Sequence, residues 1–475
     1  MLFKKYNFKD MNNLQTIFLV TLLIISSTVK AQSDKTHSLI SVPKDSILEL
    51  SYPPFSKDAF FIGRDYHHNT FRDREKGLKN MAICNFTIAD AAEPQNFKLC
   101  EELGLSVVIS VSPHLFGDQW AKMSDEEIDQ YIKNMVINGG NSKSIIGYHI
   151  CDEPSATAFP ALSKAVQAVR KYSPGKWSLI NLYPNYATIW TENQIKSQLG
   201  TKTYREYLEK FVDIVDPDII TYDNYMVQMS MDLSQSERAG KYFTNLLEVR
   251  EVALDNGIPF WNVVSGNQVR PYTPIPSPAN LALQAYTSLA AGASGIRWFT
   301  YWKGGYNYAP IDEYENRTLT WRYLQEINRQ TLMLGTIIKQ LKSTGIYFTN
   351  PAPESSLPLL PGNHILSIDT DVPMMIGEFL NTNNNTRYVM AVNLSLEKSA
   401  NFILKSIIED EQVYSVSLGE DKPILYDFEA TKFSSMNANQ GWRPKSEDES
   451  GKGFWLRAGE GVLIKCTGKT KNTKN

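Results

Sequence analysis

Apolar and polar positions alternate in two rhythms along the middle of the chain. Short runs rich in β-branched and aromatic residues predict eight strands, at 59–63, 81–86, 105–111, 145–150, 177–183, 219–225, 259–266 and 295–302. Between and after them, apolar residues recur three and four positions apart and predict helices at 94–104, 125–136, 160–172, 204–215, 242–257, 280–292 and 320–341. Strands that alternate with helices in this way predict a (β/α)₈ TIM barrel of the α/β class over residues 59–341.

The rhythm changes after the last predicted helix. Residues 342–466 read as short strands separated by turns rich in Asn, Gly and Glu, which predicts a C-terminal all-β sandwich domain. Residues 32–58 have no clear period, and we interpret them as an N-terminal arm. The tail 467–475 is polar and is expected to be disordered.

The first 31 residues have the pattern of a signal peptide. Lys4, Lys5 and Lys9 precede the apolar run "IFLVTLLIISSTV", and small residues lead to a cleavage point near Ala31. The apolar run is too short to span a bilayer comfortably. The sequence therefore predicts an exported protein, periplasmic or secreted, with no stable membrane anchor after signal cleavage.

Composition narrows the class of protein further. The chain has 475 residues, of which 42% are hydrophobic and 21% charged, with a formal net charge of −3. This balance is typical of a globular protein and argues against a nucleic-acid partner. The sequence indicates no oligomeric state.

The cysteines and histidines do not form a ligand pattern. Cys84, Cys100, Cys151 and Cys466 lack the spacing of a disulfide framework or a metal site, so we expect buried, apolar side chains. Export leaves one disulfide as an alternative. The adjacent histidines His67 and His68 have no third metal ligand at suitable spacing, so no metal or cofactor is predicted.

Two adjacent carboxylates follow the fourth predicted strand. In "IIGYHICDEPS" an apolar run ends directly at Asp152 and Glu153. The active site of a TIM barrel lies at the C-terminal ends of its strands. We therefore expect these acids at the active site; the alternative is that Glu153 is a solvated loop residue before Pro154.

Amides, acids and aromatic residues occupy the other predicted strand ends. Amides and carboxylates bind hydroxyl groups and aromatic faces stack on sugar rings, so the set predicts a carbohydrate substrate. The candidate substrate-binding residues are Asp65, Asn85, His149, Asp152, Asn181, Tyr183, Tyr225, Gln268, Trp298, Tyr301 and Trp302. A core or supporting role is the favoured alternative for His149.

Three segments carry a resemblance to a known family. "GYHICDEPS", "PDIITYDNY" and "GASGIRWFTYW", followed by a β-sandwich, resemble the large clan of TIM-barrel glycoside hydrolases that includes the β-galactosidases. The resemblance implies that Glu153 is the acid/base residue. The sequence departs from the clan at two places. Asp152 stands where Asn is usual, and "PFWNVVSGNQ" lacks the nucleophilic glutamate of the seventh strand.

Asp223 is the best remaining second catalytic carboxylate. It would act as a base in an inverting enzyme or as a nucleophile in a retaining one, depending on its separation from Glu153. A role in orienting Tyr225 or a substrate hydroxyl is the alternative. Further carboxylates near predicted strand ends are Asp65, Glu192, Asp312 and Glu313.

These observations predict an exported glycoside hydrolase that cleaves the O-glycosidic bonds of a polysaccharide or oligosaccharide. A non-catalytic carbohydrate-binding protein on a degenerate hydrolase barrel is the alternative, favoured by the seventh strand. A polysaccharide lyase using Tyr225 and His149 is a weaker third reading. Trp442 and Trp455 of the sandwich are expected to pack rather than to bind sugar.

Overall fold

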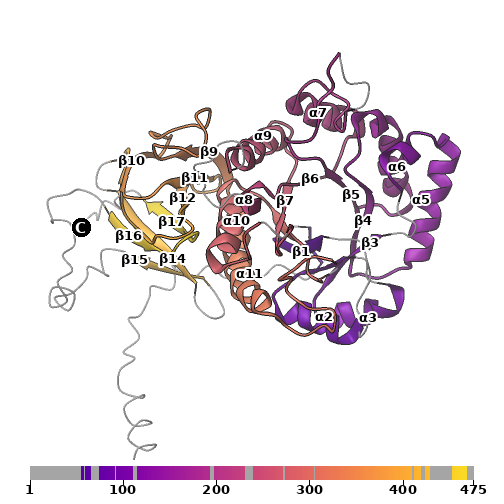
Figure 1. Ribbon diagram of the computed structural model, residues 1–475, viewed down its shortest axis with the longest axis horizontal. Helices are drawn as coiled ribbons and strands as arrows, with labels where there is room; N and C mark the ends of the chain where they lie inside the picture. The colour runs from indigo at the N-terminus through magenta and orange to yellow at the C-terminus, as the bar shows by residue number, and fades with distance from the viewer. Residues whose placement is uncertain are drawn as a thin grey trace, which may run out of the picture. The chain divides into compact units, whose positions relative to one another are not determined.

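Eight parallel strands form a ring at the centre of the chain in the computed structural model (Figure 1). Their order around the ring is β1-β8-β7-β6-β5-β4-β3-β2. The described residues are 55–57, 59–65, 74–90, 93–110, 115–192, 197–229, 239–270, 273–303, 305–408, 411–418, 423–427 and 452–467. The predicted signal peptide, most of the predicted arm and the predicted tail after Thr467 lie outside them; Thr467 itself ends a strand. The fold class is the predicted TIM barrel followed by a β-sandwich.

The barrel strands are short and mostly buried. They are β1 (Phe61–Asp65), β2 (Ile88–Asp90), β3 (Ser106–Ser110), β4 (Ile145–Asp152), β5 (Trp177–Leu182), β6 (Ile220–Asp223), β7 (Phe260–Ser265) and β8 (Gly295–Phe299). Between β1 and β2, where the ring closes, the Thr87 N–H donates to the Ile62 carbonyl at 2.8 Å, and Thr87 Oγ1 accepts from the Ile62 N–H at 2.8 Å.

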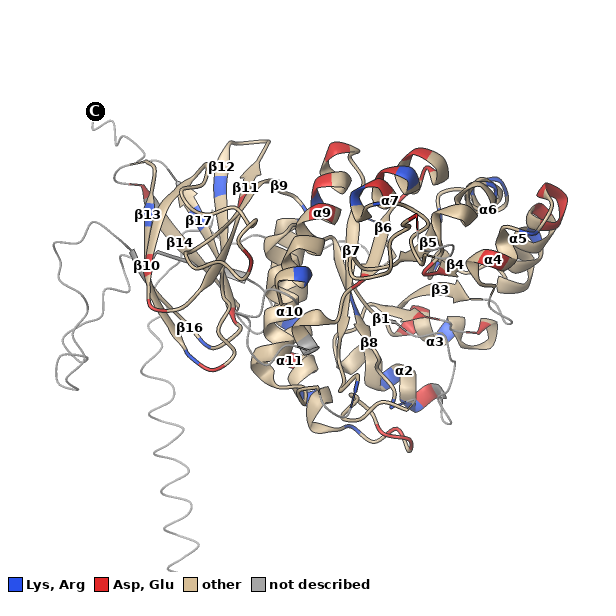
Figure 2. Ribbon diagram, turned by 45° about the horizontal axis from the view of Figure 1, so that its top comes forward, with Lys and Arg blue, Asp and Glu red and all other residues tan. Residues whose placement is uncertain are grey.

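Helices surround the ring and carry mixed charges on their outer faces, as on α5, α7 and α9 (Figure 2). The α-helices are α2 (Arg74–Ile83), α3 (Phe97–Glu102), α4 (Gly117–Trp120), α5 (Asp125–Gly139), α6 (Phe159–Tyr172), α7 (Tyr204–Lys210), α8 (Met226–Met229), α9 (Lys241–Asp255), α10 (Pro278–Ala290) and α11 (Leu319–Ile338). Shorter turns are η2 (Pro94–Asn96), η3 (Ala156–Ala158) and the π-helical η4 (Phe211–Val215). No helix among the described residues is long and apolar enough to cross a membrane.

The second strand is the one barrel strand that the sequence misplaces. The apolar run at 81–86 continues helix α2 to Ile83, and Asn85 then adopts a left-handed backbone with φ of 60°. Strand β2 begins only at Ile88. A short apolar run fits a buried helix end as well as a strand, so its periodicity could not decide between them.

Aromatic rings fill part of the barrel interior. Phe61, Trp177 and Trp261 come from β1, β5 and β7, and their ring centroids lie 5.2–5.4 Å apart. Glycines in neighbouring strands allow this close packing: a Cβ on Gly295 would lie 2.7 Å from the Trp261 indole, and one on Gly147 would lie 2.7 Å from the Trp177 carbonyl oxygen. The interior is a packed core at this level.

The residues after α11 form two antiparallel sheets. One has the order β10-β13-β16 and the other β15-β14-β17-β12-β11-β9. The strands are β9 (Lys342–Phe348), β10 (Ile365–Thr370), β11 (Met374–Asn381), β12 (Thr386–Asn393), β13 (Ala400–Ser406), β14 (Gln412–Leu418), β15 (Pro423–Asp427), β16 (Lys452–Leu456) and β17 (Gly461–Thr467). Apolar side chains from both sheets, such as Ile376 and Phe402, share one core.

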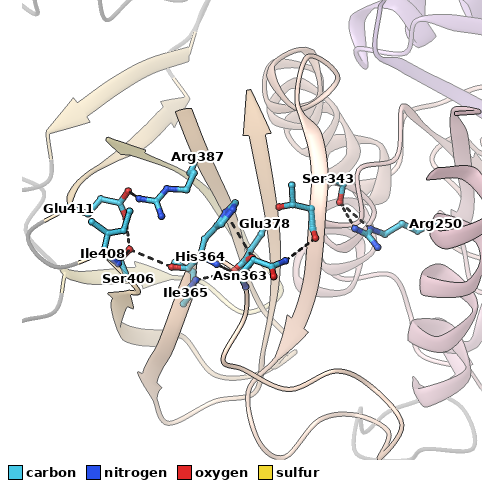
Figure 3. Close-up of polar contacts among 11 residues, drawn as sticks. Arg250, Ser343, Asn363, His364, Ile365, Glu378, Arg387, Ser406, Ile408 and Glu411 are labelled. Atoms are coloured by element: carbon cyan, nitrogen blue, oxygen red, sulfur yellow. Dashed lines mark hydrogen bonds and ion pairs between the residues drawn. The ribbon is translucent and has the colours of Figure 1, made fainter. Parts of the chain in front are cut away.

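Two buried carboxylates of the sandwich, Glu378 and Glu411, are hydrogen-bonded. The Glu378 carboxylate accepts from the backbone N–H groups of Asn363, His364 and Ile365 at 2.8–2.9 Å (Figure 3). Arg387 forms an ion pair with Glu411 in the same region (Figure 3). These contacts fix the chain around β10 and β11 without exposing charge to the apolar core.

Helix α10 lies between the barrel and the sandwich. It has no charged residue, and every side chain from Asn280 to Ala290 is buried. Gly377 of β11 packs so closely on α10 that a Cβ there would lie 2.1 Å from the Ala290 carbonyl oxygen. Arg250 of α9 donates two hydrogen bonds to Ser343 Oγ of β9, at 2.9 and 3.1 Å (Figure 3). The sandwich therefore completes the burial of a barrel helix.

Candidate active site

Three neighbouring strands bring an amide between two carboxylates. Asp152 ends β4, Asn181 lies in β5 and Asp223 ends β6. The Asn181 Nδ2 group donates to Asp152 Oδ1 at 3.2 Å and to Asp223 Oδ1 at 3.1 Å. Asn181 and Asp223 are buried, whereas Asp152 is half-buried. The sequence predicted all three residues for the site, and the structure places them in contact.

Glu153 is held immediately beyond the end of β4. Its backbone is left-handed, with φ of 43°, and its N–H donates to the Asn181 carbonyl at 2.8 Å. On its other side, the buried Tyr207 hydroxyl donates to the Pro154 carbonyl at 2.7 Å. A left-handed non-glycine residue costs about 1–3 kcal/mol and persists only where its surroundings fix it. Both hydrogen bonds supply such fixation for Glu153, whose side chain is half-buried.

Two tyrosines from the segment after β5 lie within the electrostatic field of these acids. Burial and then the negative charge of Glu153 raise the pKa of Tyr183 to about 12. Burial, followed by Asp223 and more weakly by Glu153, raises the pKa of Tyr186 above its usual range. The Tyr186 phenol thus lies near both carboxylates, and it also forms a hydrogen bond with the backbone of Tyr225. Both phenols remain neutral at ordinary pH.

Sequence reasoning missed Tyr186. It does not lie at a predicted strand end but three residues beyond Tyr183, in "YPNY". The signal was nevertheless present, because the segments after barrel strands also build TIM-barrel sites.

Aromatic rings from the segment after β6, from the end of β8 and from the loop after β8 meet beside this region. The Tyr225 ring lies 5.0 Å from that of Phe299 at an interplanar angle of 30°, and Phe299 meets Tyr306 edge-on at 5.0 Å. The peptide between Phe299 and Thr300, where β8 ends, is cis. The half-buried Trp302 follows, bridged to Ile311.

Four other predicted residues have partners elsewhere. Trp298 donates to Asn328 of α11 at 2.8 Å, and the Tyr301 hydroxyl accepts from Trp321 of the same helix at 3.1 Å. Asn85 and Gln268 donate to backbone carbonyls, of Gln325 and Thr273 respectively. These hydrogen bonds direct Trp298, Tyr301 and Asn85 toward α11, and Gln268 toward the loop after β7.

The remaining candidates have varied positions. His149 is buried within β4, and Asp65 ends β1, with its side chain outside the description. Glu192 is exposed, Asp312 accepts from the backbone N–H groups of Tyr314 and Asn316, and Glu313 pairs with Lys303 at 3.1 Å.

Predictions for histidines, tryptophans and cysteines outside this group can also be compared with the structure. The histidines at 67–68 and Trp442 lie outside the described residues. Trp455 is 51% exposed on β16, against the packing role that the sequence favoured. All four cysteines are buried and free, as expected without a disulfide. Within the described part of the chain, no cluster of three or more His, Cys, Asp or Glu side chains has the arrangement of a metal site.

A buried ion pair crosses the barrel interior near β1 and was not predicted. Arg297 of β8 donates to Asp90 at the end of β2 at 3.0 Å, and both side chains are at least 93% buried. Gly63 of β1 lies between them, since a Cβ there would lie 3.4 Å from Arg297 Cγ and 3.5 Å from Asp90 Oδ2. The sequence signal was an arginine inside the apolar strand "GIRWF".

The group formed by Asp152, Glu153, Asn181 and Asp223 offers two kinds of chemistry. Carboxyl groups exchange protons or attack as nucleophiles, and the neighbouring phenols donate hydrogen bonds to oxygen. Strand β7, Phe260–Ser265, contributes no carboxylate. A second carboxylate for such chemistry must come from outside β7, and Asp223 is the buried carboxylate in contact with Asn181.

Comparisons with known proteins place the fold. No protein-family model and no curated protein match the sequence. A catalytic mutant of a GH42 β-galactosidase from G. stearothermophilus is similar in structure, with a TM-score of 0.53 at 9% identity, over 88% of this chain and 100% of that one. A second structure, described as a glycoside hydrolase, has a TM-score of 0.50 at 9% identity over 89% and 99% of the two chains.

Larger glycosidases match over part of their length. A cold-adapted β-galactosidase from Rahnella sp. R3 has a TM-score of 0.48 at 12% identity, and the match covers 62% of this chain and 59% of that one. The chain thus spans less than two thirds of that enzyme. The two matches over nearly full length show that this chain shares its fold, a TIM barrel followed by a β domain, with the GH42 β-galactosidase and the second glycoside hydrolase, and this is the fold that the sequence resemblance implied.

Proposed function

We propose that the chain is an exported glycoside hydrolase in which Glu153 is the general acid and Asp223 the second catalytic carboxylate. One observation carries the proposal. The Asn181 amide holds Asp223 against the strand end that bears Glu153, at the face of the barrel where TIM-barrel chemistry occurs. The shared fold with glycoside hydrolases agrees with this assignment.

The roles follow from the chemistry of glycoside cleavage. Glu153 protonates the departing glycosidic oxygen, and Asp223 either activates a water molecule or attacks the anomeric carbon. Tyr183, with a pKa of about 12, is neutral at working pH and donates a hydrogen bond to a substrate or carboxylate oxygen. The rings of Tyr225 and Phe299 offer apolar faces to a sugar.

The substrate class is a polysaccharide or oligosaccharide. Amide, acid and phenol groups next to aromatic faces suit a ligand with many hydroxyls, and no cluster of cations converges on Asn181 among its described contacts. The GH42 neighbour is described as a β-galactosidase, which makes β-galactosides the first substrates to assay.

A second function is favoured by one observation. Strand β7 lacks the carboxylate that the resembled clan uses as nucleophile. A barrel that kept its sugar-binding surface and lost hydrolysis would have this property. The alternative is a non-catalytic carbohydrate-binding protein.

Parallel assays of wild type, Glu153→Gln and Asp223→Asn on aryl glycosides and polysaccharides separate the two functions. We expect each substitution to lower kcat by about 10²-fold or more, because each removes a proton donor or a carboxylate. Glu126→Gln, an exposed change on α5, is the matched control and should leave kcat unchanged. Sugar binding by wild type without turnover would support the binding protein, and unchanged kcat in Glu153→Gln would refute the assigned acid.

Export is tested separately. Expression of the full chain in a bacterial host, followed by mass spectrometry of the protein outside the cytoplasm, should give a mature N-terminus at Gln32. A protein that keeps residues 1–31 and stays in the cytoplasm would contradict export without affecting the hydrolase assignment.

A further inference from the structure

We infer that Asn181 is a positioning residue that couples the acids of this site, a role that rests on the proposed function. It makes three contacts with them. Its side-chain nitrogen donates to Asp152 and to Asp223, and its backbone carbonyl accepts from the Glu153 N–H. One residue of β5 thereby fixes the ends of both neighbouring strands.

The direction of the amide follows from the donor and acceptor inventory. An asparagine side chain has two N–H donors on one nitrogen and an oxygen that only accepts. Asp152 and Asp223 both lie within 3.2 Å of the nitrogen, so a flipped amide would direct its oxygen at two carboxylates. The buried Oδ1 atom has no hydrogen-bond partner among the described residues, which is the cost of this orientation.

The contact has a consequence for charge. Both Oδ1 atoms accept from the amide, so Asn181 stabilises the ionised form of both acids. The two carboxylates share one nitrogen and are therefore adjacent, and without the amide they would repel each other in a buried setting. Asn181 thus holds Asp223 in place beside Asp152 through one hydrogen bond to each carboxylate.

The backbone contact acts on Glu153 itself. The left-handed backbone of Glu153 needs support from its surroundings, and the Asn181 carbonyl supplies part of it. Because carbonyl and amide belong to the same residue, displacement of Asn181 moves the proposed acid and its partner carboxylate together.

Asn181→Asp is the sharpest substitution, because it keeps the shape and replaces two donors by an acceptor. At neutral pH it places a third carboxylate against Asp152 and Asp223. At low pH its protonated form again donates one hydrogen bond. We expect kcat to fall by about 10²-fold at pH 7, with a smaller change in KM, and the pH optimum to move to lower pH. Asn181→Leu should lose kcat at every pH without that move.

The matched control is Asn262→Asp. Asn262 is a buried asparagine of barrel strand β7, two strands away from β5, and its amide donates to the hydroxyls of Tyr242 and Ser288. Hydroxyls can rotate to donate to a new carboxylate, so the control should keep the wild-type pH profile. A pH profile for Asn181→Asp that matches wild type, or a shift of equal size in Asn262→Asp, would overturn the inference.

A measurement that needs no substrate separates this inference from the proposed function. We expect the difference in Tm between wild type and Asn181→Asp to be largest at pH 7–8 and to shrink toward pH 4, as the added carboxyl becomes protonated. A constant difference in Tm would refute the coupling even in an active enzyme. A shrinking difference in a protein that hydrolyses no glycoside would support the coupling and refute the proposed function.

Discussion

Single side chains at the strand ends and under the helices decide how this protein responds to pH. Glu248 of α9 is such a residue outside the proposed site. Burial, and secondarily the charge of Glu251, raises its pKa from 4.5 to about 7, while Arg205 partly offsets the shift. The carboxyl therefore costs stability when it must ionise inside the fold.

The sign of this effect gives a testable outcome. Below pH 4.5 the Glu248 carboxyl is protonated in the folded and the unfolded chain, so it costs nothing. Between pH 4.5 and 7 the unfolded chain loses the proton first, so the free energy of unfolding falls, and the loss is complete above 7. Glu248→Gln should raise the free energy of unfolding by about 1–2 kcal/mol at pH 8 and leave it unchanged at pH 4, as measured by urea denaturation. An equal gain at both pH values would contradict this account.

The buried ion pair between Asp90 and Arg297 predicts a second outcome at this scale. Asp90→Ala leaves the Arg297 guanidinium inside the barrel without its carboxylate. We expect a loss of about 3–5 kcal/mol in the free energy of unfolding. The double change Asp90→Leu with Arg297→Met should recover part of the loss, because it removes both charges. Equal losses in the single and double variants would show that the charge itself is not the cause.

At the scale of elements, the barrel strands depend on pairs of large and small residues. Gly295 of β8 leaves room for the Trp261 indole of β7, and a Cβ there would lie 2.7 Å from two indole atoms. Glycine was recognisable in the sequence, but only the register of β7 and β8, which pairs Trp261 with Gly295, gives it a reason.

Gly295→Ala should therefore destabilise the barrel by overpacking, by about 1–3 kcal/mol. Trp261→Phe should relieve the contact, so the double variant should be more stable than the sum of the single losses implies. The free energies of all four proteins from thermal or urea unfolding test this. Additive losses would mean that the two positions do not interact.

Element types with strong periodicity were predictable, and short ones were not. Helix α5 begins at Asp125, where the sequence predicted a helix. Its N-cap, Ser124, forms a capping box with Glu127. Strand β2 has only three residues, and the sequence predicted a strand at the neighbouring end of helix α2 instead. Asn85 became a candidate site residue because it lies near the end of the wrongly predicted strand. The residue that actually ends β2, Asp90, was not a candidate.

At the scale of the whole molecule, the sandwich covers a barrel helix that has no charged residue. Gly377 of β11 packs against the Ala290 carbonyl of α10. Gly377→Ala needs this contact to open and should lower the Tm by several degrees, by disturbing the joint burial of α10. Gly139→Ala, where a Cβ would meet only an ordinary 3.4 Å contact with Ile109, is the matched control and should not lower it. Equal Tm values for wild type and Gly377→Ala would indicate that α10 and the sheet can separate freely.

The sequence by itself determined the class of fold, the alternation of barrel elements, the change to β structure after α11 and the strand-end position of Glu153. These are local properties, because periodicity and the boundary between apolar and charged residues are written into neighbouring positions. The strand-end position of Asp223 was also within reach, because β6 ends there.

Only the tertiary structure decided which of the predicted side chains meet. It joined Asn181 to Asp152, Glu153 and Asp223, added Tyr186, paired Asp90 with Arg297, and turned Trp298 and Tyr301 toward α11. The physical reason is that these contacts depend on the register between strands far apart in sequence and on which side of each strand faces the barrel interior. A shift of one residue reverses that side for every residue of a strand.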